Sequence, residues 1–160
     1  MGASEFAIDN FGRNLSEAYN KQVDSDYYDH GHAGYTGTLV EKDGLIELKR
    51  PPRITAKRLS DTIAEAAHWW WWAYDTEEKY QHLHDKPSAK YRQAWDRLNE
   101  WFPPRGFKQG FMDADDICRL YDDKWGPAFA IEQSPAEKKK RWHDLPRGSK
   151  TFLFFGNASC

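Results

Sequence analysis

The fold of this chain is decided at residues 27–38, which read Tyr-Tyr-Asp-His-Gly-His-Ala-Gly-Tyr-Thr-Gly-Thr. Three glycines recur there at every third position, at Gly31, Gly34 and Gly37. Glycine at this density is typical of backbone with positive φ, or of a close approach by another group. A helical pattern precedes the stretch and a strand-like pattern follows it. We therefore expect a tight crossover from helix to strand, with Tyr35 packed beneath it.

The segment before the crossover predicts an extended lead-in over residues 1–13 and then a helix. Asn14 followed by Glu17 is a capping pair that starts a helix. Apolar and long side chains then recur at the helical period and should face a core; they are Leu15, Ala18, Tyr19, Gln22, Val23 and Tyr27.

The segment after the crossover predicts a β-hairpin. Residues 38–42 and 45–49 are strand-like, and Asp43-Gly44 lies between them. Asp-Gly between two such runs is a strong local hairpin signal. Pro51-Pro52 should end the sheet there, because proline cannot donate to a strand ladder.

Two helices should follow, over residues 55–80 and 88–101, separated by Lys86-Pro87. The first contains four consecutive tryptophans, Trp69 to Trp72. Consecutive helical positions turn by about 100°, so four tryptophans cannot all face one core. We expect the two helices to form a hairpin.

The last third predicts a short helix from Asp113, a strand at 128–132, a charged, turn-rich segment at 134–149 and a strand at 151–155. The last strand is apolar on both faces, which is typical of a strand inside a sheet. The fold class we expect is α+β, with a small, mainly antiparallel four-stranded sheet, helices packed on one face and a projecting helical hairpin. We expect one domain, with a core at 1–52 and 105–160 and the hairpin inserted at about 56–102.

Composition limits the partners. The chain has 23 Lys and Arg against 25 Asp and Glu, a net charge of −2. General binding to nucleic acid needs a cationic excess, so we expect no nucleic-acid partner. Two cysteines without a disulfide framework favour a reducing compartment. There is no apolar run of membrane-span length and no leader-like start, so we expect a cytoplasmic protein with no membrane partner.

Several motifs together resemble a known group of proteins. They are Met-Gly-Ala-x-x-Phe at 1–6, Glu-Ala-Tyr at 17–19, the run at 29–38 containing Gly-Tyr-Thr-Gly-Thr, and Phe-Phe-Gly-Asn-Ala-Ser at 154–159. This set resembles small uncharacterised proteins of tailed bacteriophages and prophages, chiefly actinobacterial ones. The resemblance covers the first third and the last strand, while residues 56–110 lie outside it. It implies a phage accessory protein acting in the host cytoplasm, and it carries over no catalytic residue.

The crossover itself offers two ligand hypotheses. His30 and His32 could ligate a metal on an extended backbone with Asp26 or Asp29, but a full site needs a further ligand from elsewhere. We favour histidines that hydrogen-bond loop backbone, and we expect no metal or other cofactor. The glycines could instead form an anion-binding nest, with Tyr35 stacking on a nucleotide. In phosphate loops, however, a strand precedes the glycines and a helix follows, which is the reverse order.

Catalytic signals are weak. The sequence has no nucleophile elbow, no His-Glu-x-x-His and no Walker motif, and Cys118 lies among apolar helical residues. The basic run 138–143 includes Trp142, which could stack on a base. Acidic neighbours at Glu137 and Asp144 favour a solvated loop.

The tryptophan run is the other candidate surface. Tryptophan and tyrosine are enriched at binding hot spots. Two interpretations stay open: the tryptophans are absorbed by the core and the second helix, or some of them face solvent. The function we expect is binding, and inhibition, of a host protein or complex, with a nucleotide-type small-ligand binder as the alternative. The candidate contact residues are His30, His32, Tyr35, Thr36, Trp69, Trp71 and Trp72.

Overall fold

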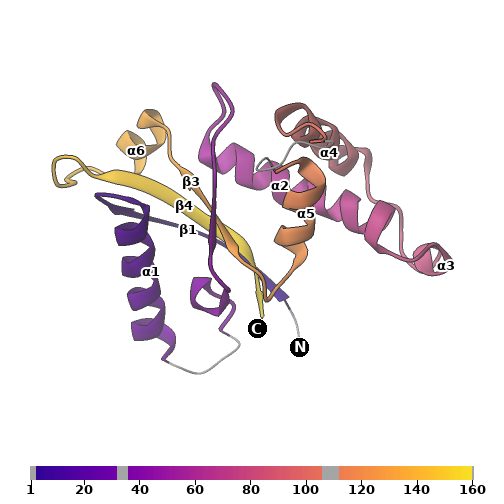
Figure 1. Ribbon diagram of the computed structural model, residues 1–160, viewed down its shortest axis with the longest axis horizontal. Helices are drawn as coiled ribbons and strands as arrows, with labels where there is room; N and C mark the ends of the chain where they lie inside the picture. The colour runs from indigo at the N-terminus through magenta and orange to yellow at the C-terminus, as the bar shows by residue number, and fades with distance from the viewer. Residues whose placement is uncertain (1–2, 32–35, 106–111, 160) are drawn as a thin grey trace. The chain divides into compact units, whose positions relative to one another are not determined.

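The computed structural model describes residues 3–31, 36–105 and 112–159 (Figure 1). They form an α+β fold with a four-stranded, mostly antiparallel sheet, which confirms the predicted class. The chain divides into two compact units. Unit 1 is formed by the residues up to Leu59 together with those from Asp123 onward, and unit 2 is Ser60–Asp122. No helix of the described ranges is both long and apolar enough to cross a bilayer.

The sheet has the order β1-β4-β3-β2. Strand β1 (Ala3–Gly12) pairs antiparallel with β4 (Lys150–Ser159), and β4 pairs antiparallel with β3 (Ala128–Glu132). Strand β2 (Leu45–Leu48) pairs parallel with β3, from Leu45 opposite Ala128 to Leu48 opposite Ile131. The predicted lead-in is thus a full edge strand that pairs with the last strand.

The predicted hairpin around Asp43-Gly44 is wrong. Residues Leu39–Glu41 form a 3-10 turn, η1, instead of a strand, and β2 finds its partner in β3. Gly44 has the positive φ of a turn, 96°, so the local signal was correct about the bend. The reason lies in the core, because Leu39 is fully buried there and is not available to a strand edge.

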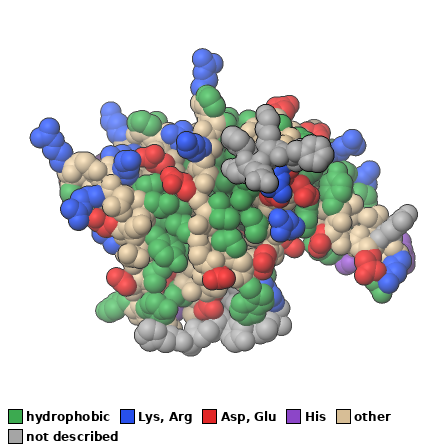
Figure 2. Space-filling view, viewed as in Figure 1, with side chains coloured by type: hydrophobic (Ala, Val, Ile, Leu, Met, Phe, Trp, Pro, Cys, Tyr) green, Lys and Arg blue, Asp and Glu red, His purple; other side chains and the backbone are tan. Residues whose placement is uncertain are grey.

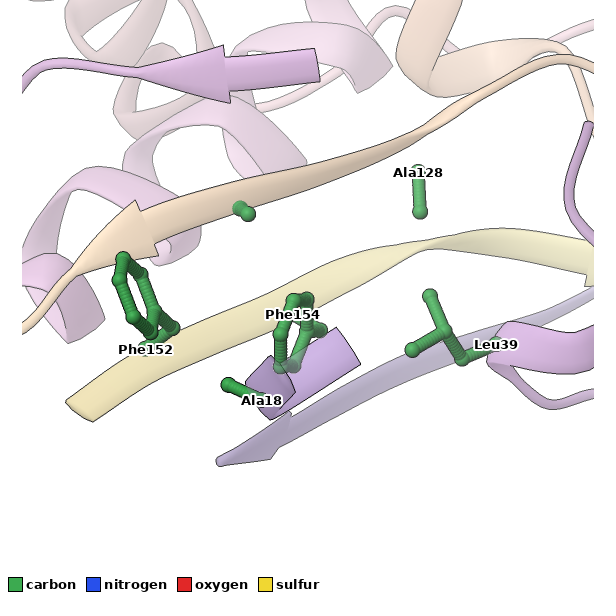
Figure 3. Close-up of a cluster of buried hydrophobic side chains, with 6 residues drawn as sticks. Ala18, Leu39, Ala128, Phe152 and Phe154 are labelled. Atoms are coloured by element: carbon green, nitrogen blue, oxygen red, sulfur yellow. The ribbon is translucent and has the colours of Figure 1, made fainter. Parts of the chain in front are cut away.

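Strand β4 is the centre of unit 1. Its residues 151–156 are all buried, which confirms the prediction of an interior strand. Phe152 and Phe154 point into a cluster completed by Ala18, Leu39, Ala128 and Ala130 (Figure 3). Small alanines thus face large phenyl rings. Each buried ring stabilises the fold by about 1.5–3 kcal/mol.

Helix α1 (Leu15–His30) covers this cluster with Ala18 and with Tyr19, whose ring lies 6.2 Å from that of Phe154. Its start is as predicted, since the side chain of Asn14 accepts a hydrogen bond from the Glu17 N–H at 2.9 Å. It ends at Gly31, where φ is +69° and the N–H donates to the Tyr27 carbonyl.

Unit 2 is helical. Helix α2 (Ala56–Trp70) leads into a π-helical turn, η2 (Trp71–Asp75), followed by α3 (Glu78–Gln81), α4 (Ala89–Trp101) and α5 (Ala114–Asp122). Ring contacts join the first part to α4: His68 with Tyr91 at 5.1 Å and Tyr74 with Trp95 at 5.6 Å. We call residues 56–101 the helical hairpin.

The segment before β4 holds a helix that was expected to be a loop. Helix α6 (Pro135–Arg141) starts with a complete capping box. Ser134 accepts from the Glu137 N–H, and the Glu137 carboxylate accepts from the Ser134 N–H. Proline at the first helical position supports this start.

Candidate functional site

The four tryptophans of the run divide into two pairs. Trp69 and Trp70 are buried, while Trp71 and Trp72 are half-buried. The Trp70 indole N–H donates to Asp115 of α5 at 2.7 Å, so this ring is a structural link between α2 and α5. Trp69, which the sequence made a surface candidate, lies inside unit 2.

The rings of this run are already used within unit 2. Trp69 and Trp72 lie 5.4 Å apart, and the Lys86 ammonium lies 5.9 Å from each ring centroid. The Arg92 guanidinium lies 5.6 Å from Trp69. Cations at this distance are attracted to the negative face of an indole ring. The four tryptophans therefore contribute more to the packing of the helical hairpin than to an exposed binding surface.

A π-helical turn, η2, follows the buried pair of tryptophans. The Thr76 N–H donates to the Trp71 carbonyl five residues earlier, at 2.8 Å, and the Thr76 hydroxyl donates to the same oxygen. A π turn inside a helix is rare and is frequent at functional sites. Just before its end, Tyr74 is 62% exposed.

Exposed apolar side chains recur within a short stretch of sequence that begins in this turn. Tyr74, Tyr80 and Leu83 are 62%, 47% and 66% exposed. They account for three of the seven exposed large hydrophobic residues in the described ranges, within ten positions of sequence. We call residues 74–84 the tip; it includes α3 at the turn of the helical hairpin (Figure 1).

Local hydrogen bonds order the tip. The Tyr80 N–H donates to Glu77, the Leu83 N–H to Tyr80 and the His84 N–H to Gln81, at 2.8–3.1 Å. The Gln81 side chain donates to the Trp72 carbonyl at 3.2 Å, which ties α3 to the π turn. The sequence reasoning missed this surface. The sequence did contain a signal for it, because the apolar residues between the two helices do not follow the helical period.

The crossover at 27–38 is only partly described. His32 and Tyr35 lie outside the described residues. His30 is exposed in the last turn of α1. The Thr36 N–H and hydroxyl both donate to the Glu41 carboxylate, at 3.3 and 3.1 Å. At Thr36 the donors that an anion would need are therefore occupied by a carboxylate of the chain itself.

A group of carboxylates starts helix α5, where Asp113, Asp115 and Asp116 have oxygens within 4.8 Å of one another. These groups already have structural partners. The Asp113 and Asp116 side chains cap each other's N–H groups at 3.0 and 3.2 Å, and Arg105 and Arg119 both lie 3.4 Å from Asp116. Burial acts to raise the pKa of Asp113, but the hydrogen bonds from the N–H groups of Asp116 and Arg105 outweigh it and lower that pKa. The cluster is a helix cap.

Cys118 is buried in α5, and burial raises the pKa of its thiol far above the ordinary value. A buried thiol stays protonated and unreactive at neutral pH.

Among the described residues, the tip is the surface with the features of a binding site. Comparison of the chain with protein-family models, curated proteins and solved structures finds no match in any of the three.

Proposed function

We propose that this chain is a phage accessory protein that binds and inhibits a host cytoplasmic protein, and that the tip of the helical hairpin makes the contact. The observation that carries the binding proposal is the exposure of Tyr74, Tyr80 and Leu83 on a segment ordered by hydrogen bonds. The phage assignment rests on the resemblance of residues 1–38 and 154–159 to phage-encoded proteins.

The tip has the composition of an interface centre. Protein interfaces combine a buried apolar centre rich in aromatic residues with a polar rim. In the sequence of the tip, acidic, basic and histidine residues alternate with the three apolar ones. They include a Lys79–Glu77 ion pair at 2.8 Å. The partner that fits is a protein with an apolar groove that takes up the two tyrosine rings and the leucine. A segment that is already ordered loses less entropy on binding than a disordered one.

The experiment is site-specific photo-crosslinking in a lysate of actinobacterial host cells. The photoreactive residue benzoylphenylalanine replaces Tyr80 in one variant and Tyr28 in the control. Tyr28 is a matched position because it is also an exposed tyrosine, at 90%, but lies on α1 in unit 1. The captured protein is then purified and its affinity is measured for the parent chain and for Tyr74→Ser and Leu83→Ser.

The proposal predicts one host protein crosslinked from position 80 and not from position 28. It also predicts affinity at least about tenfold weaker in each serine variant, since truncating a hot-spot side chain costs about 2 kcal/mol or more and about 1.4 kcal/mol corresponds to tenfold. The same proteins captured from both positions, or affinities unchanged by the serine variants, would exclude the tip as the contact.

The small-ligand alternative at the crossover gains no support from the described residues. Its donor at Thr36 already serves Glu41. The first 50 residues also hold nine acidic and five basic residues, which opposes anion binding there.

A further inference from the structure

A hollow of about 350 Å³ lies in unit 1 beside α6. The helix forms one wall with Lys138 and Lys139. The other wall is formed by residues of the segment that leads to β4, namely Trp142, His143 and residues 145–148. Figure 2 shows Lys and Arg side chains at the surface of unit 1 where α6 and this segment lie. The volume is at the lower end of the range for small-molecule sites, which is about 300–1,000 Å³.

The lining is cationic. Lys138, Lys139 and Arg147 contribute three positive charges and His143 an imidazole, and among the described residues that line the hollow there is no Asp or Glu. This contrasts with the net charge of −2 for the whole chain. A concave surface lined by one sign of charge concentrates ligands of the opposite sign.

The acid nearest to these lysines in sequence is directed elsewhere. The Glu137 carboxylate accepts hydrogen bonds from the N–H groups of Ala56, Lys57 and Ser134, at 2.8–3.1 Å. Those donors belong to the first turn of α2 and the cap of α6. Its negative charge therefore stabilises two helix starts.

Hydrogen bonds hold the wall of the hollow that is formed by the segment before β4. The Lys138 ammonium donates to the Ser149 carbonyl, which ties α6 to the segment before β4. The Ser149 hydroxyl and N–H both donate to the Pro146 carbonyl, at 2.7 and 3.1 Å. Gly148 supplies the positive φ of this turn, +82°. The hollow thus has walls that exist before any ligand arrives.

The hollow also has an apolar side, formed by Trp142, Leu145 and Pro146. The Trp142 ring is fixed edge-on against Phe11 of β1, at 5.2 Å between centroids. Its indole N–H is buried and has no acceptor among the described residues. A buried donor without an acceptor costs stability, so Trp142 offers the hollow its ring and not its N–H.

Stabilisation of helix α6 explains only some of the cationic side chains that line the hollow. Lys138, Lys139 and Lys140 lie in the last turn of α6, where cations offset the partial negative charge of the carbonyl ends. His143 and Arg147 follow the helix and cannot serve that purpose, yet they line the same hollow. Residues from two segments converge there.

We propose that this hollow binds a small phosphate-bearing molecule, with the phosphate held by Lys139 and Arg147 and an apolar or ring portion against Trp142 and Leu145. Two cationic groups from separate segments suit the several oxygens of one phosphate. The mixed lining suits an organic phosphate better than a bare ion. This site is independent of the tip and does not rest on the proposed function.

The experiment is an NMR titration of the isotope-labelled protein with four probes. They are adenosine monophosphate, inorganic phosphate, adenosine as the ring without the phosphate, and a single-stranded oligonucleotide. Binding of adenosine monophosphate is then measured by calorimetry for Lys139→Glu and Arg147→Glu. The matched control is Lys140→Glu, because Lys140 is exposed on the same helix, does not line the hollow, and changes the net charge equally.

We expect adenosine monophosphate and phosphate, but not adenosine alone, to shift the amide signals of residues 138–149. Each lining variant should weaken binding by about tenfold or more, as the loss of a charge-assisted hydrogen bond does, and Lys140→Glu by less than about threefold. Thermal melting verifies that each variant is folded.

Three outcomes overturn the proposal. The first is no shift from either phosphate probe at millimolar concentration. The second is an equal loss of affinity in Lys140→Glu, which indicates general surface attraction. The third is binding of a single-stranded oligonucleotide far more tightly than of adenosine monophosphate, which marks the surface as a nucleic-acid contact.

Discussion

The buried ammonium group of Lys42 donates a hydrogen bond to the backbone carbonyl of Asn157 at 2.5 Å, across 115 residues of sequence. A second bond from the same group reaches the Asp123 carbonyl at 2.7 Å. One side chain thus joins the segment before β2 to the last strand and to the residue where the chain re-enters unit 1.

This lysine should make stability depend on pH in the alkaline range. Burial lowers the pKa of Lys42 from 10.5 to about 8, although the nearby charge of Asp123 opposes that shift. Between these two values the unfolded chain holds a proton that the folded chain has released. Its contribution to stability is therefore full above pH 10.5 and is lost as the pH falls through 8. Urea unfolding of the parent and of Lys42→Met across this range should give a stability difference that moves in the parent's favour as pH rises. Parallel curves would contradict the lowered pKa.

The Glu137 carboxylate should stabilise the starts of both α2 and α6. Burial acts to raise its pKa, but hydrogen bonds from the N–H groups of Ser134, Ala56 and Lys57 outweigh this and lower it below 4.5. The contribution is present above pH 4.5 and is lost as the pH falls through the lowered value. We expect Glu137→Gln to cost about 1–2 kcal/mol at neutral pH, as the loss of a helix cap does.

Chemical denaturation at pH 7 and at acid pH measures this effect. Glu132→Gln is the control, because Glu132 is an exposed carboxylate at the end of β3. If both variants lose the same stability, the shared cap between α2 and α6 has no special role.

Trp70 should be a core residue of unit 2. Trp70→Ala removes a buried indole and its hydrogen bond to Asp115, and should destabilise the protein by about 3–5 kcal/mol. Trp70→Phe keeps most of the ring volume and should cost less. Thermal and urea unfolding check this order, and an alanine variant that melts like the parent would refute it.

Substitutions of tip residues should change the stability little. Leu83→Ser alters an exposed side chain, so we expect a change within about 0.5 kcal/mol. Tyr74→Ser also removes the ring contact with Trp95 and should cost about 0.5–1.5 kcal/mol. A large loss in either variant would mean that the tip is part of the packing of unit 2, and would weaken its assignment as a binding surface.

Local signals in the sequence predicted local structure well. The Asn14 cap, the helix at 88–101 and the doubly apolar strand at 151–155 have the form that their patterns indicated. The helix expected over residues 55–80 instead ends at Trp70, where the π-helical turn η2 begins. The capping pair Ser134 and Glu137 around Pro135 was a usable signal for α6, but the surrounding charge concealed it.

Structural features that depend on contacts between distant segments could not be predicted from local patterns. Gly44 does turn the chain, but β2 pairs with β3, about 80 residues later, and the pattern around Gly44 carries no signal for that pairing. Four adjacent tryptophans suggested exposure because one core cannot hold them. Lys86 and Arg92 resolve that conflict by covering indole faces. The apolar tip and the basic hollow are each built from residues close in sequence, but the local pattern does not show which of those side chains are exposed and which line a hollow.

The pairing of β1 with β4 also governs when the sheet can form during synthesis. Gly12 lies opposite Lys150, so the first strand leaves the ribosome long before its partner is translated. At typical elongation rates the delay is on the order of ten seconds. Unit 2, whose helices form from contacts close in sequence, can fold during that interval, because local contacts form fastest. The nascent chain therefore carries an unpaired strand while residues 13–149 are translated, and during this interval a chaperone or another strand can bind its open edge.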